Sequence, residues 1–324
     1  MNNCVTNYLQ FNGVTHIGES DHSAQLENNL KMFLDWAFLG IGGFFSAERN
    51  KVSASGAYGG DVTVLRKVKD PNLADGRVWE TNRKDWVWES GQAYTDKDGD
   101  IKEPIQISGV YINGTFTSTG FYLDYPNGRV IFDTPKTGTI QLEYSYRYIQ
   151  TYCASTTPWF NQLQFGSFRI DQGGFTVEGS NQWNVLAEKR VQMPAVVVEI
   201  VPRRELIPYE MGNISHFSRQ DILFHILAET SWERHRLTDI FTKQQDKVFW
   251  LFDINKVLDS GAYPLNQNGS KVNNLTYQDL VSPTGYRWQH YRVLKTSTQN
   301  LTSLDPKLFR AAARWTAETV EGNI

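Results

Sequence analysis

The chain has 324 residues, of which 40% are apolar and 13% aromatic, and its formal net charge is −3. This composition suffices for two or three packed units and excludes a largely disordered chain. The nearly balanced charge gives no overall attraction to nucleic acid or anionic lipid, and adjacent basic residues occur only as isolated pairs, such as Arg203 with Arg204. A polyanion-binding protein is therefore disfavoured.

The N-terminal residues show no targeting signal. Met1 to Gln10 lacks a basic region followed by an apolar one, and the most apolar window, Trp36 to Phe45, is interrupted by glycines. Neither a secretory signal nor a membrane span is expected. Cys4 and Cys153 lie too far apart for a metal knuckle and fit a reducing compartment, with one long-range disulfide as the alternative. We expect a protein made and kept in a cytoplasm.

In chain order, the first predicted element is a helix that begins at Ser23. Its apolar positions repeat at intervals of three and four, and it ends at the glycines that follow Leu39. The polar stretch from Ala47 to Asp61 is predicted to be an exposed loop, and a strand is expected to begin at Val62.

The segment from Asp70 to Gly99 is polar but contains Trp79, Trp86 and Trp88. Trp86 and Trp88 stand on either side of Val87, and this alternation predicts an edge strand with aromatic side chains on one face. Two interpretations are open. The rings form a platform for a sugar or a protein, or they cover the seam between two domains, which is the commoner use of large aromatic residues.

The acidic run from Asp96 to Asp100 has carboxylates at alternate positions, as calcium-binding loops do. Ile101 stands where such a loop has its turn glycine, and Ile107 stands where it has a bidentate glutamate. We therefore interpret the run as an acidic hairpin turn.

The clearest β region extends from Ile105 to Tyr152. Turns at Tyr125–Gly128 and Pro135–Gly138 separate strand-like runs, and Ile140 to Tyr148 alternates apolar and polar residues throughout. This period predicts one apolar, tyrosine-rich face and one solvated face. We expect residues 92–151 to form an inserted β-sandwich or β-meander that folds independently.

The segment from Pro194 to Ile254 is predicted to be the centre of the main domain. Its pattern indicates a buried strand at Val196–Val201, a helix from Ser218 to about Asp246 and a second strand at Val248–Phe252. On this helix, Ile226 and Leu227 are predicted to be core residues.

The remaining residues predict a strand from Gly285 to Leu294 and a closing helix from Ser303 to Thr319. The whole pattern predicts an α+β fold. Its parts are a small α/β core domain of residues 1–91 and 152–255, the inserted antiparallel β-domain of residues 92–151, and a C-terminal extension of residues 256–324.

No motif in the sequence is diagnostic of a chemistry: there is no phosphate loop, nucleophile elbow or paired-histidine helix. His225, Glu229 and Glu233 would share one face of the predicted helix, but a metal site needs a further ligand. A partly buried histidine bonded to a nearby carboxylate is the simpler interpretation. Asp253 ends a strand and could act as an acid, although an Asp there more often caps a turn. We expect no metal, no cofactor and no enzymatic activity.

One segment carries a resemblance. Residues Tyr122 to Tyr148, with the turn Tyr125–Gly128 and the run Arg129–Phe132, look like a segment of structural proteins of tailed-bacteriophage virions. The order of an N-terminal helix, β-strands, the unit Val196–Leu227 and a strand ending in Asp253 is similar to that of neck and tail-terminator (head-to-tail connector) proteins of long-tailed phages.

The resemblance implies a tail-terminator-like core and a structural, non-enzymatic virion protein of the neck or tail end. Such a protein forms a homo-oligomeric ring, a hexamer or a dodecamer, that joins head and tail. It contacts other neck, tail tube or sheath proteins, is assembled in the host cytoplasm, and lets DNA pass without specific binding or contact with a membrane.

The candidate subunit contact is the charged helix face with Glu233, Arg236 and Asp239, since mixed charges fix the register between neighbours. Two alternatives remain. One is a glycan-binding or adaptor module of a phage tail, motivated by the tryptophans. The other is a carboxylate-dependent hydrolase, motivated by Asp253 and Glu229.

Overall fold

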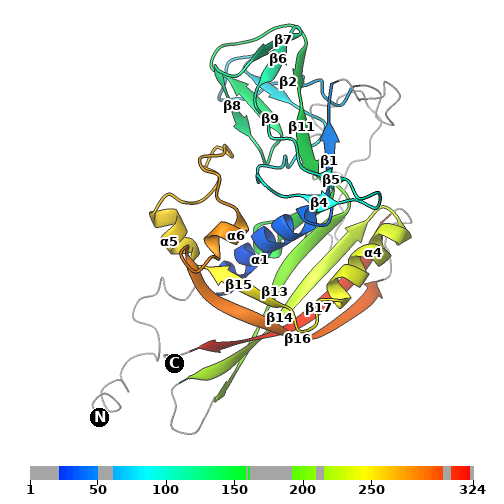
Figure 1. The fold of residues 1–324 in the computed structure, drawn as a ribbon, viewed down its shortest axis with the longest axis vertical. Coiled ribbons are helices and arrows are strands. Elements are labelled where there is room, and N and C mark those ends of the chain that lie inside the picture. Colours follow the sequence, from blue (N-terminus) through cyan, green and yellow to red (C-terminus); the bar gives the residue numbers. More distant parts are fainter. Residues whose placement is uncertain are drawn as a thin grey trace.

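The computed structural model describes residues 22–49, 61–157, 160, 192–208, 215–301 and 308–321. Figure 1 shows a unit of short strands at the top and a curved six-stranded sheet at the bottom, with helices packed on the sheet. We call the strands from β1 (Phe44–Ala47) to β11 (Tyr144–Arg147) the β unit, and the large sheet with its helices the sheet unit. In these ranges no helix is long and apolar enough to cross a membrane.

The large sheet has the strand order β12-β13-β14-β17-β16-β15. Its strands are β12 (Gln150–Cys153), β13 (Ala195–Pro208), β14 (His216–Ala228), β15 (Val248–Phe252), β16 (Arg287–Leu301) and β17 (Phe309–Glu321). β12 and β13 are parallel, and all other neighbours are antiparallel. The fold is therefore α+β, as predicted, and β13, β15 and β16 confirm the three strands expected in this part of the chain.

Two helices, α1 (His22–Leu39) and α4 (Ser231–Thr242), cover one face of the large sheet. α1 confirms the predicted N-terminal helix. Beneath α4, the ring of Phe224 lies 4.5 Å from that of Trp315 and 4.6 Å from that of Phe241, measured between centroids. The main apolar core is therefore the layer between these helices and the sheet.

Two short helices, α5 (Ile254–Asp259) and α6 (Tyr277–Leu280), lie beside the edge strand β15. The Tyr277 hydroxyl donates to the Trp250 carbonyl at 2.5 Å, and Asn29 Oδ1 accepts from the Phe252 backbone at 2.8 Å. Side chains thus satisfy backbone groups that an edge strand would otherwise present to another chain.

The helix predicted from Ser218 to Asp246 is wrong over its first half. Residues 216–228 form β14, and α4 begins only at Ser231. Ile222, Phe224 and Ile226 are buried at alternate positions on the helix-covered face. β13 and β17 pair with this strand on both sides, so its backbone groups bond across the sheet rather than along a helix.

The predicted closing helix from Ser303 to Thr319 is also wrong from residue 309 onward, because residues 309–321 form β17 inside the large sheet, whereas its first residues, 303–307, lie outside the described ranges. Its alanines favour a helix by intrinsic propensity. In the structure Ala311, Ala313 and Ala317 are buried on the face where α4 packs on β17. Small side chains there leave room for the helix, and tertiary pairing overrides the local preference.

The β unit contains four small sheets, with strand orders β1-β11, β10-β6-β7, β2-β3-β9-β8 and β4-β5. Besides β1 and β11, its strands are β2 (Arg66–Val68), β3 (Val78–Glu80), β4 (Tyr94–Thr95), β5 (Ile101–Lys102), β6 (Val110–Ile112), β7 (Thr115–Thr117), β8 (Phe121–Asp124), β9 (Arg129–Phe132) and β10 (Ile140–Leu142).

The predicted insert, residues 92–151, takes strand partners from earlier in the chain. β9 pairs with β3 and β11 pairs with β1, whereas β12 at the end of the predicted insert joins the large sheet. The division into three domains stays a prediction. Strand pairing indicates that the β unit begins before Gln92 and ends before Gln150.

The alternation predicted for Ile140 to Tyr148 changes phase. The apolar residues up to Tyr144 are buried, but after it Ser145 and Arg147 are buried and Tyr146 is only half-buried. The strand is interrupted between β10 and β11, which shifts the faces. Arg147, predicted to be solvated, therefore points into the interior.

Candidate interaction surface

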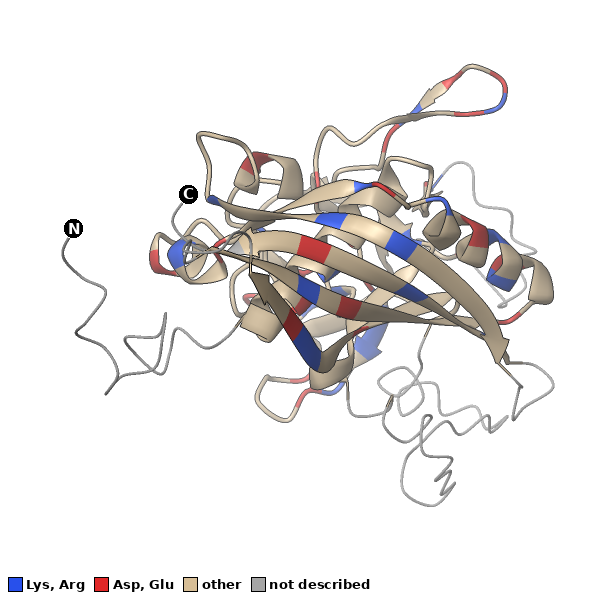
Figure 2. Ribbon diagram, turned by 90° about the horizontal axis from the view of Figure 1, so that it is seen from below, with Lys and Arg blue, Asp and Glu red and all other residues tan. Residues whose placement is uncertain are grey.

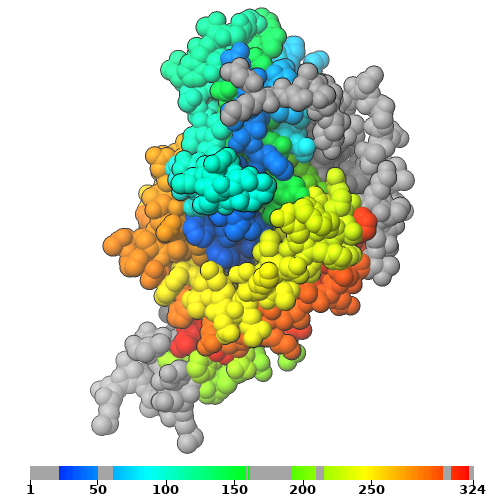
Figure 3. Space-filling model, turned by 45° about the vertical axis from the view of Figure 1, so that its right-hand side comes forward, coloured from blue at the N-terminus to red at the C-terminus, as the bar shows by residue number. Residues whose placement is uncertain are grey.

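The predicted subunit contact lies on α4, which Figure 3 shows in yellow-green at the surface, next to green segments of the β unit. Glu233 closes a capping box with Thr230, and its Oε1 accepts a hydrogen bond of 2.5 Å from the Tyr148 hydroxyl. Burial and this carboxylate together raise the pKa of Tyr148. Glu233 thus ties α4 to the β unit and is not free for a partner.

The other two residues of the predicted contact, Arg236 and Asp239, are exposed. The Arg236 guanidinium lies 4.4 Å from the ring centroid of Trp232, which is itself 61% exposed. Exposed Trp and Arg are the residue types that most often anchor protein interfaces. A subunit contact at this position stays a prediction.

The histidine and glutamates expected on one helical face are separated in the structure. His225 lies on β14, Glu229 lies in the turn after it, and Glu233 lies on α4. His225 Nε2 is 2.6 Å from Oε2 of Glu199 on β13. Burial lowers the pKa of His225, and the bond to Glu199 opposes this. The simpler interpretation, a partly buried histidine bonded to a carboxylate, is confirmed with a different carboxylate.

Other candidate residues have structural roles. The Asp253 side chain accepts the Lys256 N–H at 3.2 Å and caps α5, as an Asp after a strand often does. Cys153 is a buried free thiol whose pKa burial raises to about 12, so it is not a thiolate at neutral pH. Cys4 lies outside the described residues. Within the described ranges, no group of three His, Cys, Asp or Glu residues could hold a metal ion.

The three tryptophans are core residues. Trp79, Trp86 and Trp88 are 7%, 0% and 8% exposed, and the Trp86 indole donates to the Thr81 hydroxyl at 3.0 Å. Trp86 forms only an isolated bridge to Tyr146 rather than the predicted edge strand. The rings are therefore used for packing and present no platform to a sugar, while their placement at a seam between two domains stays a prediction.

The acidic run closes the hairpin of β4 and β5. Asp96 Oδ1 accepts the backbone N–H groups of Asp98 and Asp100, each at 2.9 Å. The interpretation of this run as a hairpin turn is therefore confirmed.

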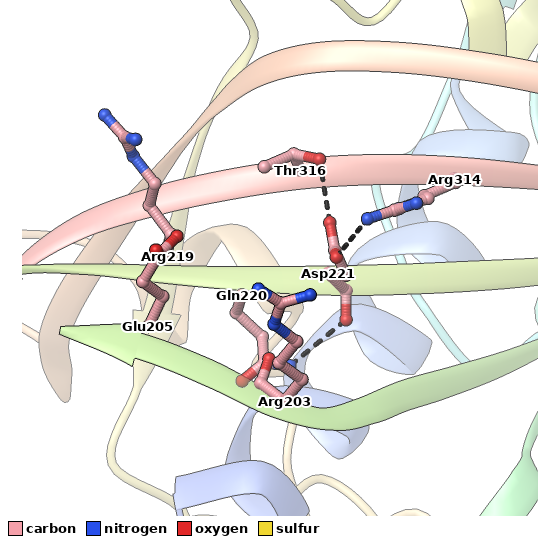
Figure 4. Close-up of a pocket in the computed structure, with 7 residues that line it drawn as sticks. All are labelled: Arg203, Glu205, Arg219, Gln220, Asp221, Arg314 and Thr316. Atoms are coloured by element: carbon pink, nitrogen blue, oxygen red, sulfur yellow. Dashed lines mark hydrogen bonds and ion pairs between the residues drawn. The ribbon is translucent and has the colours of Figure 1, made fainter.

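A polar surface missed by the sequence analysis lies on the face of the large sheet opposite α1 and α4, which we call the open face. Three of its strands line a shallow cavity of about 220 Å³, formed by Arg203, Glu205, Arg219, Gln220, Asp221, Arg314 and Thr316 (Figure 4). Asp221 accepts hydrogen bonds from Arg314 and, at 2.7 Å, from the Thr316 hydroxyl. Burial would raise the pKa of Asp221, but these bonds lower it.

Charges alternate in sign across four strands of the open face. Glu205 on β13 stands opposite Arg219 on β14, Arg219 stands opposite Glu318 on β17, and Glu318 stands opposite Arg292 on β16. Residues directly opposite in a ladder share a face of the sheet, and Figure 2, which views this face, shows the alternation of red and blue. We call these four residues the charge row. Arg219 Nε lies 2.6 Å from Glu318 Oε2.

A second group missed by the sequence analysis, partly exposed at Lys31 and Asp85, lies where α1 meets the β unit. We call Lys31, Asp35, Asp85, Glu89 and Arg147 the ionic cluster. Arg147 Nη2 lies 2.6 Å from both carboxylate oxygens of Glu89, and the two side chains are only 3% and 1% exposed. Lys31 Nζ lies 2.8 Å from Asp35 Oδ2. The three carboxylates outnumber the two cations by one.

Asp85 is the strained member of the cluster. Its φ of 55° lies in the left-handed region, and its Oδ1 is 3.4 Å from Arg147 Nε. Burial raises the pKa of Asp85 to about 6, against the attraction of Arg147, although 26% of the side chain is exposed. Such features also occur in functional sites. Here the cluster bonds mainly within itself at the seam of two units, as a structural ion-pair network does.

The sequence contained little signal for either surface. Lys31 and Asp35 are four residues apart on a helix, the usual spacing of a surface pair, and the other members of the ionic cluster come from distant segments. The charge row became visible only with the register of the sheet. Comparison of the chain with known protein families and with curated proteins finds no match.

Proposed function

We propose that this chain is a structural subunit of a tailed-phage virion that assembles as a ring at the neck or tail end and joins head and tail. The resemblance of residues 122–148 and the order of elements motivate the virion assignment. The observation that carries the assembly role is the charge row of the open face, whose charges are arranged in register across four strands.

The chemistry of the open face suits a protein partner. Its charged groups are spread over several strands and are already paired, as in Arg219 with Glu318 and Arg314 with Asp221. Ordered charges of both signs guide docking and fix register more than they add affinity. Such a surface selects one orientation of a neighbouring subunit or virion protein.

The exposed α4 surface around Trp232 and Arg236 is the second contact of the proposed ring. A ring requires heterologous contacts, in which one patch meets a different patch on the next copy. The net charge of −3 suits a channel that lets DNA pass without holding its phosphates. The partners proposed are neighbouring neck, tail tube or sheath proteins, in a virion assembled in the host cytoplasm.

The two alternative functions lose the residues that motivated them. The tryptophans of the proposed sugar platform are buried, and Asp253 caps a helix. Glu229 lies in a turn beyond β14 and not beside His225 on a helix.

The test is electron microscopy and sedimentation of the purified full chain and of two variants. Arg236→Glu with Asp239→Lys reverses the exposed α4 charges and leaves the Glu233 cap intact. Lys97→Glu with Asp98→Lys makes the same change at the hairpin tip, where the side chains are 87% and 64% exposed. We expect rings from the wild type and the hairpin variant only. Rings from all three would place the contact elsewhere, and a wild type that stays monomeric at every concentration would overturn the proposed function.

A further inference from the structure

The charge row has a symmetry that its individual ion pairs do not reveal. In strand order β13, β14, β17 and β16 the signs are minus, plus, minus, plus, given by Glu205, Arg219, Glu318 and Arg292. When the order of four alternating charges is reversed, the charge at every position changes sign. A second copy of the row that lies against the first in reverse order therefore places each charge opposite a charge of the other sign.

We propose that the open face binds a second copy of itself about a two-fold axis that runs along the strands between β14 and β17. The rotation brings Glu205 of each copy against Arg292 of the other, and Arg219 against Glu318. Each contact then occurs twice, as in any isologous interface. The occupant of this face is thus a second copy of the same chain, in one orientation.

The neighbouring rows of the open face fit this arrangement in part. On one side of the charge row, Phe217 and Val320 stand opposite one another and are half-buried, so the axis brings Phe217 of each copy against Val320 of the other. On the other side, Asp221 stands opposite Thr316, so the axis brings Asp221 of each copy against Thr316 of the other.

The contact is small, which makes the pair weak and reversible. Four strands and the three rows of side chains described above cover about 14 Å by 14 Å, or about 200 Å² on each copy. Stable complexes bury about 800 Å² per partner. Because the contact is rich in exposed charges, for example Arg292 at 59% exposure, salt should weaken it strongly.

This pairing also bears on assembly, and here the inference rests on the proposed function. A ring that joins head to tail has a polar axis, so neighbours around that ring cannot share this two-fold contact. The pair is therefore the form before assembly, and it covers the open face until a virion partner replaces the second copy.

The test is sedimentation of the full chain at about 20 mM and about 500 mM salt, over a wide range of protein concentration. We expect a monomer–dimer equilibrium that salt weakens. Arg292→Glu sets two glutamates against each other at both ends of the contact and should weaken dimerisation at least about tenfold. Lys97→Glu makes the same charge change on the distant hairpin and should leave dimerisation unchanged.

The decisive variant is Glu205→Arg combined with Arg292→Glu, which should restore the dimer. These residues lie three strands apart, about 14 Å within one chain, so each can compensate the other only across two copies. A wild type that is monomeric at low salt, an unaffected single variant, or a double variant without rescue would each overturn the pairing. Dimers that never form rings would count against the proposed function alone, and rings without a charge-sensitive dimer would count against the pairing alone.

Discussion

The replacement Arg147→Met tests the role of the ionic cluster most directly. The Arg147 side chain is 3% exposed, and its Nη2 contacts both carboxylate oxygens of Glu89 at 2.6 Å. Its Nη1 donates to the Asp35 carbonyl at 3.2 Å. Methionine fills much of the same volume but removes the charge and all of these donors, so Glu89 would remain buried without a cation.

The magnitude follows from the burial of both partners. Removing one member of a buried ion pair costs about 3–5 kcal/mol, because the other charge stays desolvated. Total stabilities of domains are about 5–15 kcal/mol, so this loss leaves the protein near its unfolding threshold. The double variant Arg147→Met with Glu89→Gln removes the stranded charge and should recover most of the loss.

Urea unfolding followed by tryptophan fluorescence measures both variants, since Trp86 and Trp88 are buried and directly precede Glu89 in the chain. Arg292→Met is the matched control, because its ion pair with Asp246 has side chains 59% and 61% exposed. We expect a change of less than about 1 kcal/mol there. A loss below about 1 kcal/mol in Arg147→Met, or no recovery in the double variant, would refute the reasoning.

Three further outcomes follow from the structure. Because burial raises the folded-state pKa of Asp85 to about 6, above its unfolded value, this group's contribution to stability is complete below about pH 4 and is lost as the pH rises past 6. Asp85→Asn should reduce the loss of folding free energy between pH 4 and pH 8 by about 1–2 kcal/mol. Melting temperatures of the wild type and the variant over this pH range measure the difference, and parallel curves for the two proteins would contradict it. Ile226→Ala should cost about 2–5 kcal/mol because Ile226 is fully buried, whereas Leu206→Ala, at a residue 54% exposed, should cost little. Residues 92–151 expressed alone should show collapsed amide signals because β3 and β1 are missing, and dispersed signals would restore the predicted boundary.

The elements that the sequence predicted correctly are those with one dominant local signal. The β-branched run before Pro202 and the run at Val248–Phe252 are too short and apolar for a surface helix, and both are strands. The N-terminal helix has apolar spacing that fits no strand. In each case local preference and tertiary environment agree.

The two wrong helices share a cause. Ile222 and Ile226 are four residues apart and fit a helix, but with Phe224 between them they also fit a period of two. The alanines of β17 favour a helix in isolation. Pairing with neighbouring strands makes both segments strands. In the pair β14 and β17, residues up to about a hundred positions apart in the chain stand opposite each other. A single sequence does not contain that pairing, so the charge row could not be predicted either.

We expect the ionic cluster also to fix how the β unit is held relative to the open face. An apolar seam tolerates small rotations because the hydrophobic effect is not directional, whereas the planar Arg147 guanidinium has donors in fixed directions. We therefore expect the cluster to contribute more to orientation than to stability. In the double variant with Glu89→Gln, the amides of β11 and of residues 85–89 should exchange with deuterium faster than in the wild type, while those of β14 should not. Equal protection of β11 in both proteins would mean that apolar contacts alone fix the β unit, and that the ion pairs are only a consequence of the packing.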